Sequence, residues 1–277
     1  MTPYIKFLVK HLPKNIIFVF LYKKVMEILS FYNIKGGVGK TATAVNIAFL
    51  ASTEKKKVLL WDLDPQGAAT YYYSVQGSSK SWLKGVIKGK DDIREFIQKT
   101  EYDRLDIIPS DFSFRLIDVF FNDIKKSEKR FNNLFNKLKK EYDYVILDCP
   151  PGISLLAENI LFLSDLILVP TIPTPLSLRT HDQLILFCEN NKIKLNKLLF
   201  FLSMVEIKKN LHMEHMEYFK KIPDQFCKTY IPYRSAIEKM GIYRSPIAKA
   251  FPNSSATAAY KKLWKEIKHF IQTADLE

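Results

Sequence analysis

Cysteine is scarce in this chain of 277 residues, and the three that occur, Cys149, Cys188 and Cys227, lie far apart. Their spacing fits neither a zinc site nor a redox pair, so the sequence predicts no metal cluster. We expect reduced, buried thiols, as in a cytosolic protein. None of the five histidines has a partner at metal-ligand spacing.

Long apolar runs are also missing from the start of the chain. Residues 1–25 contain five lysines, no acid and an apolar patch at 16–22, which is shorter than the roughly 20 residues of a membrane span. A signal peptide would share that charge and short apolar core, but no small-residue cleavage site follows. We favour Met26 as the functional start, with an upstream extension over 1–25 and a single domain over 26–277. A peripheral membrane anchor stays open as the alternative.

Acidic residues are too few to balance the basic ones. Lys and Arg number 42 against 29 Asp and Glu, a formal charge of +13, and the part after residue 25 still carries 37 basic residues. This excess suits a polyanionic partner, either DNA or an acidic membrane surface. Charge alone does not choose between the two.

The most informative stretch is an apolar strand, Ile28–Tyr32, that leads into a glycine-rich loop and then a helix over 40–53. Such a loop turns successive N–H groups inward, and the helix N-terminus adds partial positive charge, so the segment predicts a nucleoside triphosphate site. Lys40 would reach the β- and γ-phosphates, and the Thr41 hydroxyl would hold Mg²⁺. The plainer alternative is a glycine turn beside two solvated lysines. The predicted phosphate-binding segment comprises Gly36, Gly37, Val38, Gly39, Lys40, Thr41 and Ala42.

Two acidic segments follow strands and complete this pattern. A second strand, 58–62, ends in Asp62 and is followed by Asp64, and a later apolar run from Tyr142 ends in Asp148. Ligands of open α/β sheets bind outside the carboxyl ends of the strands, so these acids should face the glycine loop. The sequence therefore predicts carboxylates that organise Mg²⁺ and a water molecule.

The remaining pattern supplies further strands and two amphipathic helices. The strands are expected at 105–109, 165–171, 197–204 and 228–232. A helix over 122–141 carries an apolar stripe that we interpret as core and not as a cofactor site: Ile124, Phe131, Leu134 and Leu138. The three tyrosines at 71–73 should pack along a helix. The lysines at 80, 84, 88 and 90 should lie on a solvated face.

Three motifs in the right order resemble the family that includes ParA, Soj and MinD. Lys35-Gly-Gly-Val-Gly-Lys-Thr41 is similar to its deviant Walker A motif, Asp62-Leu-Asp64-Pro-Gln-Gly67 to its switch, and Asp148-Cys-Pro-Pro to its Walker B segment. The resemblance covers roughly residues 26–271. It implies the P-loop NTPase fold of the deviant Walker A class, a doubly wound, mostly parallel α/β sheet flanked by helices. It also implies a slow, Mg²⁺-dependent ATPase that alternates between a monomer and an ATP-dependent homodimer.

The resemblance also implies roles for single residues. Lys35 would reach the nucleotide of the partner subunit, and Asp64 would position the attacking water. Thr41, Asp62 and Asp148 would organise Mg²⁺, and Pro232 would contact the adenine base of ATP.

Partitioning of plasmid or chromosomal DNA is the implied task, in the cytoplasm and on the nucleoid, with a ParB-like activator and nonspecific DNA as partners. The family's usual DNA-binding arginine is missing after Pro232, and Arg234, Lys239 and Arg244 are nearby substitutes.

A MinD-like ATPase on a membrane is the main alternative, because the helix over 260–271 has an apolar face. We expect that face to close over the sheet instead. A scaffold that binds nucleotide without hydrolysis and a small-molecule kinase are further alternatives, and the kinase lacks an acceptor-site motif. The apolar face consists of Tyr260, Leu263, Trp264, Ile267 and Ile271.

Overall fold

The protein was analysed as a computed structural model that describes residues 26–77, 82–111, 114–115, 127–219 and 225–274. The predicted extension over 1–25, with its boundary at Met26, lies outside these ranges and stays a prediction. Lys80 and Ile124 lie outside them too.

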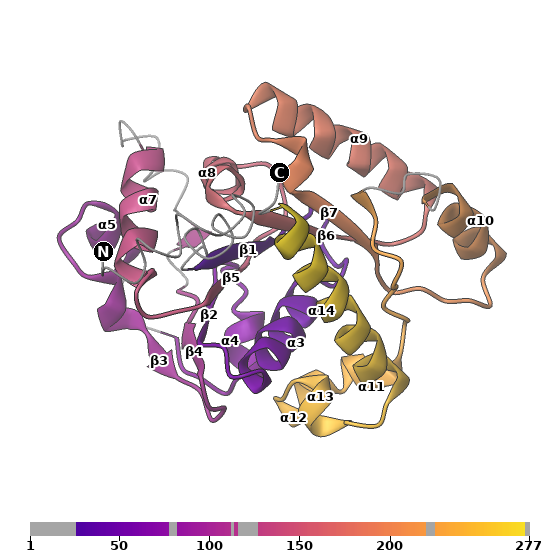
Figure 1. Cartoon of the computed structure of the whole chain (residues 1–277), viewed down its shortest axis with the longest axis horizontal. Coiled ribbons are helices and arrows are strands. Elements are labelled where there is room, and N and C mark those ends of the chain that lie inside the picture. The colour runs from indigo at the N-terminus through magenta and orange to yellow at the C-terminus, as the bar shows by residue number, and fades with distance from the viewer. Residues whose placement is uncertain (1–25, 78–81, 112–113, 116–126, 220–224, 275–277) are drawn as a thin grey trace, which may run out of the picture.

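One seven-stranded sheet organises the described residues, in the order β3-β4-β2-β5-β1-β6-β7 (Figure 1). Only the short β3 is antiparallel to its neighbour; the other neighbours run parallel. The predicted doubly wound α/β fold is confirmed. The strands are β1 (Glu27–Phe31), β2 (Val58–Asp62), β3 (Gln98–Lys99), β4 (Leu105–Ile108), β5 (Tyr144–Asp148), β6 (Leu166–Thr171) and β7 (Leu198–Leu202).

Helices cover both faces of this sheet and build one core on each side. α3, α4 and α14 pack on one face, and α7, α8 and α9 on the other. Because both faces are covered, the central strands β1 and β2 are buried at every position, without alternation between core and solvent. The helices are α3 (Lys40–Thr53), α4 (Ala68–Tyr72), α5 (Leu83–Ile87), η1 (Ile93–Phe96), α7 (Ser127–Leu138), α8 (Leu155–Leu163), α9 (Pro175–Asn190), η3 (Leu195–Lys197), α10 (Asn210–Phe219), α11 (Ser235–Glu238), α12 (Met240–Tyr243), α13 (Ile247–Ala250) and α14 (Ser255–Ala274).

The two amphipathic helices serve the core, as predicted. On α7 the side chains of Phe131, Leu134 and Leu138 are buried. α14 begins at Ser255, five residues earlier than predicted, because the Ser254 hydroxyl caps it by accepting a hydrogen bond from the Thr257 N–H at 3.1 Å. None of the helices in the described ranges combines the length and apolarity needed to cross a membrane.

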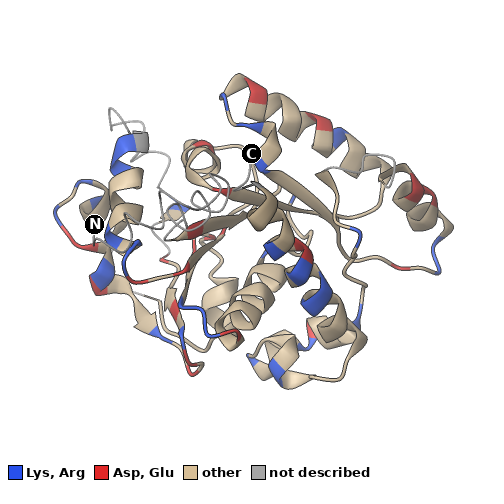
Figure 2. Cartoon of the chain, in the orientation of Figure 1, with Lys and Arg blue, Asp and Glu red and all other residues tan. Residues whose placement is uncertain are grey.

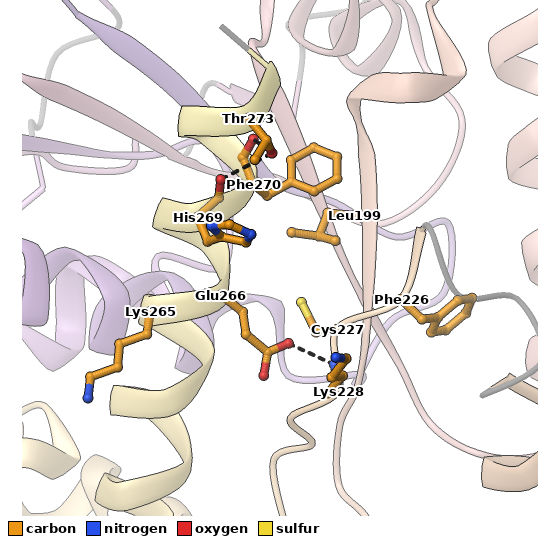
Figure 3. A pocket seen from close by; sticks show the side chains of 9 residues that line it. All are labelled: Leu199, Phe226, Cys227, Lys228, Lys265, Glu266, His269, Phe270 and Thr273. Carbon is orange, nitrogen blue, oxygen red and sulfur yellow. Dashed lines mark hydrogen bonds between the residues drawn. The ribbon is translucent and has the colours of Figure 1, made fainter. Parts of the chain in front are cut away.

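The strand predicted at 228–232 is wrong. In the described residues this part of the chain forms two isolated bridges in place of a strand, Phe200 with Phe226 and Val205 with Pro232. Between them, the Glu266 carboxylate of α14 accepts hydrogen bonds from the N–H groups of Lys228 and Thr229, at 2.7 and 3.0 Å (Figure 3). The Ile231 N–H still donates to the Leu202 carbonyl of β7 at 2.8 Å, but the Thr229 N–H is bound by a side chain, so no continuous ladder forms.

Candidate functional site

The glycine loop joins β1 to α3 at the middle of the sheet and is held in place from outside. Gly37 and Gly39 have φ values of 70° and 92°, a backbone region that side chains other than glycine rarely adopt. Asn33 pins the loop entrance: its side-chain amide donates to the Pro170 carbonyl, and its Oδ1 accepts from the Lys35 N–H at 2.9 Å. Sequence reasoning missed Asn33, although an asparagine between a buried strand and a glycine loop is a recognisable turn signal.

Two neighbouring loops confine the glycine loop further. A Cβ atom on Gly39 would lie 2.8 Å from Ser203 Oγ, directly after β7, so only glycine fits there. After β5, the Gly152 N–H donates to the Ile34 carbonyl at 2.9 Å. The Tyr32 hydroxyl donates to the Gly152 carbonyl at 2.9 Å. The loop shape is therefore fixed by contacts that are remote in sequence.

Lys40 is the first residue of α3, and its side chain is buried. Its ammonium donates to the Lys35 carbonyl at 3.2 Å, which closes the loop on itself. Burial lowers the pKa of Lys40, and the nearby Asp148 carboxylate opposes that shift. The structure thus places the Lys40 ammonium near Asp148, one of the acids that the sequence predicted to face the glycine loop.

Asp62 and Asp148 are direct register partners at the ends of β2 and β5, and neither exposes surface. Asp62 is held by hydrogen bonds: its Oδ2 accepts from the Thr70 N–H and hydroxyl, at 2.8 and 2.7 Å, and its Oδ1 from the Asp64 N–H at 3.3 Å. Burial raises the pKa of Asp62 to about 6, although the Thr70 donors work against the rise.

Asp148 lacks such support. Neither of its carboxylate oxygens has a hydrogen-bond partner of normal geometry among the described residues. Burial and the neighbouring Asp62 raise the pKa of Asp148 well above its usual range, and the Thr41 hydroxyl is near enough to oppose that shift. A buried carboxylate without partners is costly unless a cation neutralises it.

This donor set fits Mg²⁺. No group of three or more His, Cys, Asp or Glu side chains suited to a metal occurs in the ranges described. Mg²⁺ commonly binds through one or two carboxylates, a phosphate and water molecules, so Asp148, Asp62 and the Thr41 hydroxyl suffice.

The other predicted site residues lie at the edge of this group. Asp64 is half-buried, and its Oδ1 accepts from the Gln66 N–H at 2.9 Å. Lys35 is half-buried in the loop. Pro232 is buried and bridged to Val205, two residues beyond Ser203, so it belongs to the chain beside the loop and not to the loop itself.

Two open cavities lie along α14. One, of about 400 Å³, is lined by the Cys227 thiol, Glu266 and His269 and by the apolar side chains of Leu199 and Phe270 (Figure 3). A second, of about 410 Å³, lies between the extended segment before Arg234 and the first turns of α14. Three cations and no acid line it: Lys228, Arg234 and Lys262.

Comparison with known proteins agrees with this arrangement. A family model described as an AAA domain matches residues 26–201. The virulence plasmid ParA family protein pGP5-D of Chlamydia psittaci is 31% identical over 88% of this chain and 95% of its own length. This chain belongs to the ParA family.

Further relatives place it in the same group. The sporulation initiation inhibitor protein Soj of Bacillus subtilis is 30% identical, over 87% of this ParA-family chain and 98% of its own length. The septum site-determining protein MinD of Pyrococcus horikoshii, solved with Mg-ADP, has the same fold. Its TM-score is 0.72 at 21% identity, with 87% of this chain and 96% of that one covered.

Proposed function

We propose that this ParA-family protein is an Mg²⁺-dependent ATPase that uses ATP-driven dimerisation as a switch in partitioning plasmid or chromosomal DNA. One observation carries the proposal: a glycine loop with a buried lysine lies beside two buried carboxylates, and one of these has no hydrogen-bond partner of normal geometry among the described residues. Phosphate groups and a divalent cation together would neutralise this arrangement.

Each residue has a task in the proposed hydrolysis. The backbone of residues 36–42 and the Lys40 ammonium bind the phosphates of ATP. Thr41, Asp148 and Asp62 hold Mg²⁺, which would neutralise the phosphate charge. Asp64, half-buried beside them, orients the attacking water. Lys35 reaches the phosphates bound by the partner subunit, and Pro232 contacts the adenine base.

The proposed partners are a ParB-like activator and nonspecific DNA, in the cytoplasm at the nucleoid. Support for DNA comes from the cavity of about 410 Å³ beside α14, whose lining contains three cations and no acid: Lys228, Arg234 and Lys262. Lys261 and Lys265 are exposed on the same helix, and Figure 2 shows basic residues along it. Contacts of this kind with DNA phosphates would weaken steeply as salt rises.

The MinD-like alternative receives less support. It requires the apolar face of α14 to be available to lipid. The side chains of Tyr260, Leu263, Trp264 and Ile267 are instead buried against the core that α3 shares.

Light scattering on a sizing column, with ATP and Mg²⁺, ADP and Mg²⁺, or ATP and EDTA, tests the switch. We expect dimers only with ATP and Mg²⁺, and monomers for Lys35→Ala under every condition. Lys88→Ala, which removes an exposed lysine at the end of α5, is the matched control and should dimerise like the wild type. Dimers that form equally without ATP would refute the switch. ATP binding without any phosphate release, with DNA present, would favour the scaffold alternative.

A further inference from the structure

We propose that Thr70 is a positioning residue for the Mg²⁺ site, because it fixes the orientation of the Asp62 carboxylate. The inference rests on the function proposed above. Thr70 lies in α4, eight residues after Asp62, and its side chain is buried. Both of its donors, the backbone N–H and the hydroxyl, are directed to one oxygen, Asp62 Oδ2.

The direction of the Thr70 proton is determined by a third contact. The Thr70 Oγ1 accepts a hydrogen bond from the Ser110 N–H at 2.8 Å. A hydroxyl carries a single proton, and because Ser110 N–H can only donate, that proton goes to the acceptor, Asp62 Oδ2. Ser110 in turn donates through its own hydroxyl to the Asp64 carbonyl, so both acids of the segment are tied to the chain beyond β4.

This arrangement divides the work between the two oxygens of Asp62. Oδ2 is engaged by two short hydrogen bonds, whereas Oδ1 accepts only the longer one from the Asp64 N–H. Oδ1 therefore keeps the better acceptor capacity for a cation or its water molecules. Partners of this kind orient ligating carboxylates and commonly affect metal affinity strongly.

The helix that carries Thr70 is itself anchored on both sides. Before it, the Gly67 N–H donates to the Asp64 carbonyl at 2.9 Å. After it, the Tyr73 hydroxyl donates to the Val45 carbonyl in α3 at 2.7 Å. The position of the Thr70 hydroxyl is therefore also supported by contacts other than those with the carboxylate.

The contrast with other buried threonines argues against a purely structural role. A helical threonine usually returns its hydroxyl to the carbonyl four residues earlier. Thr180 in α9 does so, donating to the Leu176 carbonyl at 3.0 Å. Thr70 instead directs its hydroxyl to a carboxylate that the core has buried completely.

Thr70→Val, Thr70→Ala and Thr70→Ser in the full chain test the inference, with Thr180→Val as the matched loss of a buried hydroxyl. The probe is ATP with a methylanthraniloyl group on the ribose, whose affinity is measured by fluorescence with Mg²⁺ and with EDTA. Thermal melting identifies the variants that fold. Thr70→Ala removes the hydroxyl without adding a methyl group, which covers the case in which Thr70→Val does not fold.

For Thr70→Val and Thr70→Ala we expect the gain in affinity that Mg²⁺ provides to fall about tenfold, with affinity in EDTA unchanged. Thr70→Ser and Thr180→Val should keep the wild-type gain. A gain within twofold of wild type in a folded Thr70→Ala, or an equal loss with and without Mg²⁺, would overturn the role of Thr70 and leave the proposed function intact. A wild type that gains nothing from Mg²⁺ would overturn both.

Discussion

The carboxylates of Asp148 and Glu266 differ in their hydrogen-bond partners. Asp148 is fully buried at the end of β5, and neither oxygen has a hydrogen-bond partner among the described residues. Glu266, on α14, accepts from two backbone N–H groups and from the Thr229 hydroxyl. An unsatisfied buried acid lowers stability, and a satisfied one holds two segments together. The fold therefore tolerates a cost at the ends of the central strands that it avoids at the edge of β7.

This difference distinguishes a candidate ligand site, at Asp148, from a structural contact, at Glu266. Both regions lie beside cavities or loops, and both contain acids and lysines. Only the first combines them with left-handed glycines and a second buried carboxylate. Four experiments test this distinction.

The largest effect is expected from Asp64→Ala. If the half-buried acid orients the attacking water, the rate of phosphate release falls at least about 100-fold, the usual range for a lost acid–base group. ATP binding and dimerisation should persist, because Asp64 does not hold the phosphates. A single-turnover assay with purified dimer measures this, and Asp91→Ala, in a loop after α5, is the control for loss of an acid. Hydrolysis above one tenth of the wild-type rate would remove Asp64 from the mechanism.

Asp148→Asn should separate stability from function. Removing a buried charge beside Asp62 relieves like-charge repulsion, so the nucleotide-free protein should melt about 2–4 °C higher, the shift that about 1 kcal/mol gives in a domain of this size. Stabilisation by ATP with Mg²⁺ should disappear. Differential scanning calorimetry with and without nucleotide measures both. A lower Tm without nucleotide would contradict our view that the buried Asp148 carboxylate destabilises the nucleotide-free protein.

Glu266→Ala should show the reverse pattern. Two backbone N–H groups lose their acceptor, so we expect a loss of about 1–3 kcal/mol in the free energy of unfolding. The rate of ATP hydrolysis per folded molecule should change less than threefold. Urea unfolding and a phosphate-release assay are the measurements, and Glu214→Ala, an exposed acid on α10, is the control. A large loss of activity at unchanged stability would place Glu266 in the functional region.

The smallest effect concerns pH. The pKa of Asp62 is raised by burial to about 6, so between about pH 4 and pH 6 the folded protein holds a proton that the unfolded chain releases. The stability of the nucleotide-free protein therefore falls in this range as pH rises. Asp62→Asn should reduce that fall, which Tm measured at intervals of half a pH unit would show. Identical pH profiles of the wild type and the variant would exclude Asp62 as the cause.

The glycine loop and the acids beside it could be predicted because their signals are local. Gly37 and Gly39 are required by backbone conformation, and Asp62 and Asp148 end apolar strands that any parallel sheet aligns. The contacts of Thr70 and Ser203, and that of Asn33 with Pro170, could not be predicted, because each depends on a partner in another element. The prediction of a strand at 228–232 was wrong for the same reason: its apolar and β-branched residues favour a strand, but Glu266, 37 and 38 residues away, accepts from two of its N–H groups.

The sequence alone was enough to place most of the parallel strands, the glycine loop and the residue types that gather there, because hydrophobic periodicity and glycine conformation act over short distances. The tertiary structure decided which of the two acids lacks hydrogen-bond donors among the described residues. Asp62 and Asp148 look alike in the sequence, and only the packing of α4 gives Asp62 the donors of Thr70 while Asp148 receives none. Hydrogen bonds are short and directional, so the partner of a buried carboxylate is settled only when distant segments meet.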